Sequence, residues 1–174
     1  MKYILLLLII GLSMYIDVRY GKIPNALIAA GIITGVSINI YSSGITGLLY
    51  SAIGFLLGIM LLILPFALGG IGGGDVKLLG VIGVIEGSRL VFYIFLSSAI
   101  WGGIISAILL VYHKQFPILL KWTGNLFKQL YWFLCTDGKH SLNVDPLPST
   151  NLSMPYTVPI FLGTVTILLA GTAL

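Results

Sequence analysis

Residues 45–68 read ITGLLYSAIGFLLGIMLLILPFAL and contain no charged side chain. A helix needs roughly 20 apolar residues to cross the hydrocarbon core of a bilayer, so this stretch can span a membrane unaided. The whole chain has the same character: 58% of its 174 residues are apolar and 8% are charged, whereas about 25% are charged in ordinary soluble domains. The composition therefore excludes a soluble enzyme, a disordered protein and a nucleic-acid binder, and it predicts an integral membrane protein.

Further apolar stretches flank residues 45–68 and are separated from one another by polar or glycine-rich turns. They cover approximately residues 3–16, 24–41, 76–85, 90–112 and 155–174. The first follows Met-Lys as a secretory signal would, but no small-x-small cleavage site closes it, so we expect it to be retained. The stretch 76–85 reaches only about halfway across a bilayer unless its flanks are also helical. The sequence predicts an all-α fold of about six transmembrane helices in a single membrane-embedded domain, residues 1–174.

The basic residues are distributed unevenly among the predicted loops. Lys2 and Arg89 lie on one side of the predicted bundle, and seven of the nine basic residues lie on the other: Arg19, Lys22, Lys77, Lys114, Lys121, Lys128 and Lys139. Cytoplasmic loops carry the excess of Lys and Arg, so we expect a multi-pass protein of the cell (plasma or inner) membrane with both termini outside. The loops 17–23, 69–77 and 113–154 then face the cytoplasm.

Residues 113–153 form the only long stretch that does not read as a span. The first half is aromatic and apolar, and Lys114, Lys121 and Lys128 recur in it at helical spacing, which is typical of a helix lying in the membrane interface. The second half is rich in Ser, Asn, Asp and Pro and predicts a loop. We expect a cytoplasmic interfacial segment that anchors the chain, and a substrate-docking surface is the alternative interpretation.

Ionisable residues within or beside membrane spans are costly and mark function, so the five acidic residues of the chain are the first candidates for a site. Glu86 stands beside Arg89 in a predicted outside turn, where a surface ion pair explains it. Asp137 and Asp145 lie in the polar loop and need no special role. These three acids are therefore set aside.

The two remaining acids, Asp17 and Asp75, are both predicted to lie at the cytoplasmic face. Asp17 ends the first span, and Asp75 follows the glycine-rich residues 69–74. Singly, each has an ordinary explanation: Asp75 as a helix N-cap, and Asp17 as a partner of Arg19 or Lys22. Together they offer a defined chemistry, because one ionised carboxylate can activate water while a protonated one hydrogen-bonds to a substrate carbonyl.

A metal site is the competing chemistry for two carboxylates. It would need further oxygen or nitrogen ligands, and the only histidines, His113 and His140, are not linked to either acid by spacing. The single cysteine, Cys135, excludes a disulfide framework and a cysteine-ligated zinc site. We therefore expect no metal and no other cofactor.

Three stretches carry a resemblance to a known family. Residues 17–25 read DVRYGKIPN, residues 72–78 read GGGDVKL, and residues 154–159 read MPYTVP. They resemble, in order, the first-aspartate segment, the Gly-x-Gly-Asp-x-Lys motif and the Pro-[Tyr/Phe]-x-x-Pro motif of the type IV prepilin peptidases. These enzymes are membrane aspartic proteases that share the GxGD motif with presenilin and signal-peptide peptidase.

The resemblance implies an endopeptidase that removes the basic leader from type IV pilin-like, Flp or flagellin-like precursors at the cytoplasmic membrane face. It implies that Asp17 and Asp75 are the catalytic pair, and that a second set of residues shapes the site or binds substrate: Pro24, Asn25, Gly72, Gly74, Lys77 and Pro155. The expected partners are the precursor protein and the lipid bilayer, with no nucleic acid.

The chain departs from the larger bacterial members of this family. Those enzymes carry a four-cysteine zinc segment and also N-methylate the new pilin terminus, whereas Cys135 is the only cysteine here. We therefore expect a peptidase without methyltransferase activity, like the short enzymes that serve Flp/Tad-type pili or archaeal flagellins. The alternative functions are a small cation-binding channel or transporter and a pilus-assembly scaffold. Against a transporter, both acids are predicted at one face rather than near mid-membrane.

Overall fold

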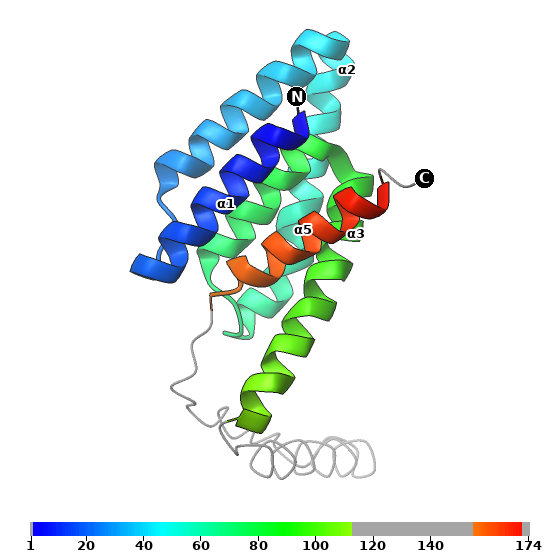
Figure 1. The fold of residues 1–174 in the computed structure, drawn as a ribbon. Helices are drawn as coiled ribbons and strands as arrows, with labels where there is room; N and C mark the ends of the chain where they lie inside the picture. Colours follow the sequence, from blue (N-terminus) through cyan, green and yellow to red (C-terminus); the bar gives the residue numbers. More distant parts are fainter. Residues whose placement is uncertain (1, 113–154, 172–174) are drawn as a thin grey trace, which may run out of the picture. The chain divides into compact units, whose positions relative to one another are not determined.

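The computed structural model describes residues 2–112 and 155–171, and these residues form helices joined by short turns, with no strand among them. The helices are α1 (Lys2–Tyr20), α2 (Asn25–Ala67), α3 (Gly73–Tyr112) and α5 (Thr157–Gly171), shown in Figure 1. The predicted all-α fold is confirmed for this part of the chain. The predicted interfacial segment, 113–153, lies outside the described residues.

The chain divides into two compact units. One consists of Met1–Gly103 with Pro155–Leu174, and the other of Ile104–Met154. The described part of the second unit is the last stretch of α3, residues 104–112. All contacts discussed below lie within the first unit, and the single domain expected from the sequence stays a prediction.

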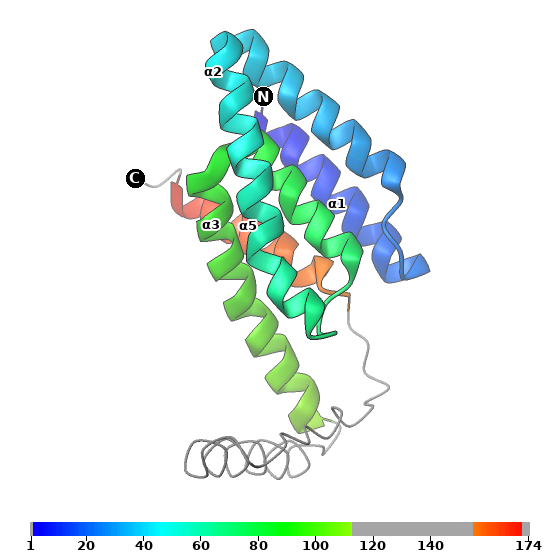
Figure 2. The same cartoon turned by 180° about the vertical axis from the view of Figure 1, so that it is seen from behind.

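Glycines interrupt both long helices. The backbone leaves the helical conformation at Gly44 (φ 60°, ψ −136°) in α2 and at Gly87 (φ 79°, ψ 178°) in α3. Positive φ values of this kind are accessible to glycine and strained for residues with a side chain. Both views show the chain reversing direction at each interruption, so that α2 and α3 each consist of two arms (Figures 1 and 2).

Among residues 2–112 and 155–171, three helices are long and apolar enough to cross a membrane: α1, α2 and the 73–109 part of α3. The chain is therefore a membrane protein in composition and helix length, as the sequence predicts. The interruption at Gly44 falls in the turn expected between the second and third apolar stretches. The count of about six crossings stays a prediction. The structure gives the length and hydropathy of the described helices, and it does not give their placement in a bilayer.

The first arm of α3, residues 73–86, is the centre of the fold. From Val76 onward nearly every side chain in it is buried, including Leu78, Leu79, Ile82 and Ile85. A helix that is apolar on all sides is one that other helices surround. The short stretch 76–85 therefore need not be lipid-exposed, because the rest of the bundle encloses it.

This burial overturns the expectation for Glu86. The side chain is only 5% exposed, whereas Arg89, its predicted surface partner, is exposed. The interruption at Gly87 separates the two residues, so that Glu86 stays with the enclosed arm and Arg89 begins the next. The predicted surface ion pair is therefore wrong.

Two glycines let α2 and α3 pack backbone against backbone. A Cβ atom at Gly54 would lie 2.0 Å from the carbonyl oxygen of Gly83, and a Cβ atom at Gly83 would lie 2.0 Å from the carbonyl oxygen of Gly54. One turn further along α2, a Cβ atom at Gly58 would lie 2.6 Å from the carbonyl oxygen of Leu79. Small residues at these positions allow the close approach that membrane helices use in place of a hydrophobic driving force.

Side chains of α2 satisfy the last carbonyls of the first arm of α3. An interrupted helix leaves its final carbonyl groups without their regular partners. Here Asn39 Nδ2 donates to the Val84 carbonyl at 2.8 Å, Ser51 Oγ donates to the same oxygen at 3.0 Å, and the Tyr50 hydroxyl donates to the Glu86 carbonyl. A helix can therefore end inside the bundle without exposing unpaired backbone groups.

Candidate functional site

Asp17 is the last member of the inward-facing stripe of α1. The buried residues of this helix follow a spacing of three and four positions, with an adjacent pair at the second step: Leu6, Ile9 with Ile10, Ser13 and Asp17. Helical residues at this spacing lie on one face. The stripe therefore carries Asp17 to the inside of the bundle, where its side chain is 9% exposed.

Asp75 lies in the first turn of α3 and takes part in closing that helix end. Its backbone N–H donates to the Gly72 carbonyl at 3.1 Å, and the backbone of Gly72 hydrogen-bonds to its carboxylate. A carboxylate at the third helical residue that accepts from the backbone N–H of the residue before the helix is one half of a capping box. Asp75 is thus the third helical residue and not the N-cap itself.

The geometry around Asp75 leaves one carboxyl oxygen available. The side chain is 6% exposed, and its Oδ1 atom has no hydrogen-bond partner among the described residues. A Cβ atom at Gly72 would lie 3.2 Å from Oδ2, so a larger residue there would press on the oxygen that faces the helix end. The first glycine of the GxGD motif therefore leaves room for this carboxylate.

The two carboxyl groups lie in the same region of the fold although 58 positions separate them in the chain. The charge of Asp17 acts directly on Asp75, so the carboxyls lie within electrostatic range of each other. Both are buried, where the low dielectric strengthens such an interaction. The structure therefore unites the two acids that the sequence singled out.

The start of α5 supplies a third side to this site. The Thr157 hydroxyl donates to Asp17 Oδ2 at 2.8 Å, and both groups are buried. The neighbouring Tyr156 hydroxyl hydrogen-bonds to Ser98 and lies within electrostatic range of Asp75. Thr157 thus contacts the Asp17 carboxyl, and the residue before it, Tyr156, lies near the Asp75 carboxyl.

Thr157 is a candidate site residue that the sequence analysis missed. It occupies an unspecified position of the Pro-Tyr-x-x-Pro motif, so the resemblance does not mark it. The signal that could have found it is periodicity, because Thr157, Ile160 and Thr164 form the buried stripe of α5. Its position at the start of that stripe places it opposite the end of α1, against which α5 packs.

Three of the other predicted site residues link the two aspartate segments. Lys77 Nζ donates to Asn25 Oδ1 at 3.0 Å at the protein surface, which joins the first residue of α2 to the N-terminal part of α3. A Cβ atom at Gly74 would lie 3.2 Å from the side chain of Ile23. The second glycine of the motif therefore allows the segment before α2 to pack closely against the helix that carries the second aspartate.

The two predicted prolines mark the starts of helices. Pro24 immediately precedes α2 in an extended conformation (φ −64°, ψ 130°) and is exposed. Pro155 precedes α5, and its carbonyl accepts a hydrogen bond from the Val158 N–H at 3.3 Å. Their fixed φ suits a helix entry.

The ordinary explanation for Asp17 as a partner of Arg19 receives no support. The Arg19 guanidinium donates to the Tyr15 hydroxyl at 2.8 Å and lies over the ring of Tyr20. The metal alternative rests on His113 and His140, which lie outside the described residues. Within 2–112 and 155–171, no three His, Cys, Asp or Glu side chains are grouped in a way that could hold a metal ion.

Comparison with known proteins identifies the family. Curated proteins and solved structures give no match. The sequence model of the type IV leader peptidase family matches residues 4–107, a range that includes both aspartates and the glycine motif between α2 and α3. The resemblance predicted from the motifs is thereby confirmed, and the chain belongs to the type IV leader peptidase family.

Proposed function

We propose that the protein is an aspartic endopeptidase that cleaves the basic leader from type IV pilin-like, Flp or flagellin-like precursors, with Asp17 and Asp75 as its catalytic pair. Membership of the leader peptidase family supports a peptidase. The observation that supports the aspartic mechanism is that two buried carboxyls lie within electrostatic range of each other, and that one oxygen of Asp75 has no hydrogen-bond partner among the described residues.

The pair supports general acid–base hydrolysis of a peptide bond. One carboxylate removes a proton from water, which attacks the scissile carbonyl while the other, protonated carboxyl hydrogen-bonds to the carbonyl oxygen. The tetrahedral intermediate collapses when the C–N bond breaks and a proton passes to the leaving amine. The hydrogen bond from Thr157 fixes the orientation of Asp17, and Asp75 Oδ1 is the oxygen free to meet water or substrate.

The surroundings of Asp75 suit an extended substrate segment. The turn between α2 and α3 contains the exposed glycines Gly69, Gly70 and Gly72, and a backbone without side chains lets another chain approach closely. A precursor with a basic leader joined to an apolar helix would present its cleavage point where that helix leaves the membrane. The distribution of basic residues supports the cytoplasmic face as the place of cleavage.

The test is cleavage of a purified precursor segment that contains a basic leader and the following apolar helix. The full chain in lipid vesicles is expected to release the leader at a single bond, detected by the masses of both products. With a methyl donor present, the new N-terminus is expected to remain unmethylated. An intact precursor together with a cation flux through the same vesicles would contradict the proposal and favour the channel alternative.

Thr157→Val is expected to lower kcat by roughly ten- to a hundredfold with little change in KM. The variant keeps the shape of the side chain but removes the donor to Asp17, and small displacements of catalytic groups have effects of this size. Thr164→Val is the matched control, because Thr164 is equally buried on α5 and donates to the Ile160 carbonyl of its own helix.

Thr157→Ser restores the donor and is expected to recover most of the cleavage rate. Equal losses of kcat in Thr157→Val and Thr164→Val would show that any apolar replacement on the α5 stripe has the same effect. That result would contradict a positioning role for Thr157.

A further inference from the structure

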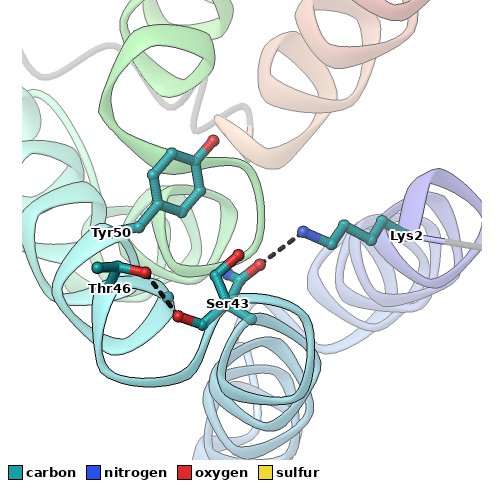
Figure 3. A pocket seen from close by; sticks show the side chains of 6 residues that line it. Lys2, Ser43, Thr46 and Tyr50 are labelled. Carbon is teal, nitrogen blue, oxygen red and sulfur yellow. Dashed lines mark hydrogen bonds between the residues drawn. The ribbon is translucent and has the colours of Figure 1, made fainter.

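A second polar region lies at the other end of α1 from Asp17. It is a pocket of about 320 Å³ lined by Lys2, Asn39, Ser43, Thr46, Gly47 and Tyr50, and we call it the Lys2 pocket (Figure 3). Lys2 and Asp17 are separated by about 20 Å along the helix at the usual rise per residue. The pocket is therefore distinct from the aspartate site.

The ammonium group of Lys2 is held in place by a fixed amide. Lys2 Nζ donates to Asn39 Oδ1 at 2.6 Å. Asn39 is 3% exposed, and its Nδ2 donates to Ser51 Oγ at 2.8 Å and to the Val84 carbonyl at 2.8 Å. These bonds determine the direction of Oδ1. An ammonium group has three donors, so two remain for a ligand beside the one that Asn39 accepts.

The charge of the pocket favours an anion. Its rim adds the exposed Ser43, which has a hydroxyl group, and the exposed Thr46, whose hydroxyl donates to the Ser43 carbonyl at 2.5 Å. None of the described residues that line the pocket has a carboxylate. Glu86 lies within electrostatic range of Lys2, but it does not line the pocket, and its Oε1 atom is buried. A ligand in the pocket would therefore meet the Lys2 ammonium and the Ser43 hydroxyl and not the Glu86 Oε1 atom. Charge-assisted hydrogen bonds to an oxyanion are the strong interactions available to such a group.

An exposed apolar stripe begins at the rim of the pocket. It follows one face of the second arm of α2 at spacings of three and four residues and consists of Thr46, Leu49, Ile53, Leu56 and Met60. The four apolar members are 57%, 55%, 59% and 72% exposed. The stripe is about 20 Å long, which exceeds the depth of one leaflet of a bilayer core about 30 Å thick.

Aromatic residues mark the depth of this end of the bundle. Tyr3 and Tyr41 belong to the segments around the pocket and are 49% and 94% exposed. Exposed tyrosines are typical of the membrane–water interface, at the level of the lipid headgroups. A phosphate beside Lys2 would then lie at the level of the lipid headgroups, and an acyl chain on the stripe would lie in the hydrocarbon core.

We propose that the Lys2 pocket binds the phosphate of an anionic phospholipid whose acyl chain lies along the stripe from Leu49 to Met60. A free phosphate ion would use the pocket alone, whereas an amphiphile uses both features. The site is independent of the leader peptidase activity, because it lies at the opposite end of α1 and includes neither aspartate.

Native mass spectrometry of the full chain in detergent tests this site. Phosphatidylglycerol is expected to bind more tightly than phosphatidylcholine with the same acyl chains. Lys2→Gln is expected to weaken the binding of phosphatidylglycerol roughly tenfold, the size expected for loss of a charge-assisted hydrogen bond. Arg89→Gln removes the same charge from an exposed residue outside the pocket, and it should leave the affinity unchanged.

A second pair of variants tests the pocket without altering Lys2. Ser43→Asp places a negative charge on the pocket rim and is expected to weaken phosphatidylglycerol binding by a similar factor. Ser42→Asp, at an exposed neighbour that does not line the pocket, is the control. Equal effects of Lys2→Gln and Arg89→Gln, equal binding of the two lipids, or displacement of the lipid by equimolar inorganic phosphate would each overturn the proposal.

Discussion

Asp75→Asn is expected to lower the rate of leader cleavage by roughly 10²–10⁴-fold, the contribution typical of a general acid or base. Asparagine has nearly the same shape as aspartate, and its amide oxygen can still accept the hydrogen bond from the Gly72 backbone. The helix end is therefore preserved while proton transfer is lost. The measurement is the initial rate of leader release per folded protein, with folding checked by the thermal transition.

Asp17→Asn is expected to have an effect of the same size. The asparagine oxygen can accept the hydrogen bond from Thr157 that Asp17 Oδ2 accepts now. Because the two carboxyls act as one unit, the double variant should be no slower than the slower single variant. Effects that multiply in the double variant would contradict a shared mechanism.

Glu86→Gln is the matched control for both substitutions. It removes another buried carboxyl from the same arm of α3, eleven residues beyond Asp75. Its cleavage rate per folded protein is expected to equal that of the unmodified chain. A loss comparable to that of Asp75→Asn would show that any buried acid of this arm is required, and it would contradict the assignment of the catalytic pair.

Gly54→Ala is expected to lower the free energy of unfolding by about 3 kcal/mol, the upper part of the range for overpacking. The added Cβ would lie 2.0 Å from the Gly83 carbonyl oxygen, and backbone atoms cannot turn aside as a flexible side chain can. The arms of α2 and α3 must therefore move apart. In Gly83→Ala, the added Cβ would lie at the same distance from the Gly54 carbonyl oxygen, so this variant should have a similar effect.

Gly103→Ala is the matched control for the glycine substitutions. A Cβ atom there would meet nothing within 4 Å, and replacing glycine by alanine inside a helix favours the helix by roughly 0.5–1 kcal/mol. Its thermal transition in detergent should be unchanged or slightly higher. In the double variant Gly54→Ala with Gly83→Ala, the loss should be less than additive, because one separation of the helices relieves both clashes. Equal transitions in Gly54→Ala and Gly103→Ala would contradict close packing at this contact.

The sequence allowed prediction of the features that depend on local pattern. Apolar runs marked the helices, and the glycine at residue 44 marked the interruption of α2, because only glycine adopts that backbone conformation without strain. The motif around Asp75 and the side of the membrane assigned to Asp17 led to the expectation that the two acids share one site. The structure brings their charges within range of each other.

The features that the sequence did not reveal depend on distant contacts. Thr157 lies 140 positions from the aspartate that accepts its hydrogen bond, and no local signal distinguishes it from other threonines in apolar helices. Glu86 was misjudged for the opposite reason, since Arg89 is close in sequence and the reversal at Gly87 takes the two side chains into different surroundings. Proximity along the chain was mistaken for proximity in space.

The side-chain capping of the first arm of α3 has a consequence for how the protein is made. In lipid an unsatisfied backbone group costs several kcal/mol, and the carbonyls of Val84 and Glu86 receive bonds from Asn39, Ser51 and Tyr50. A ribosome produces α2 before α3, so these donors are already in the membrane when the arm emerges. Synthesis from the N-terminus thus places the hydrogen-bond donors of α2 in the membrane before the carbonyls that they bind. A chain that lacked α2 would insert this arm with its last carbonyl groups unpaired.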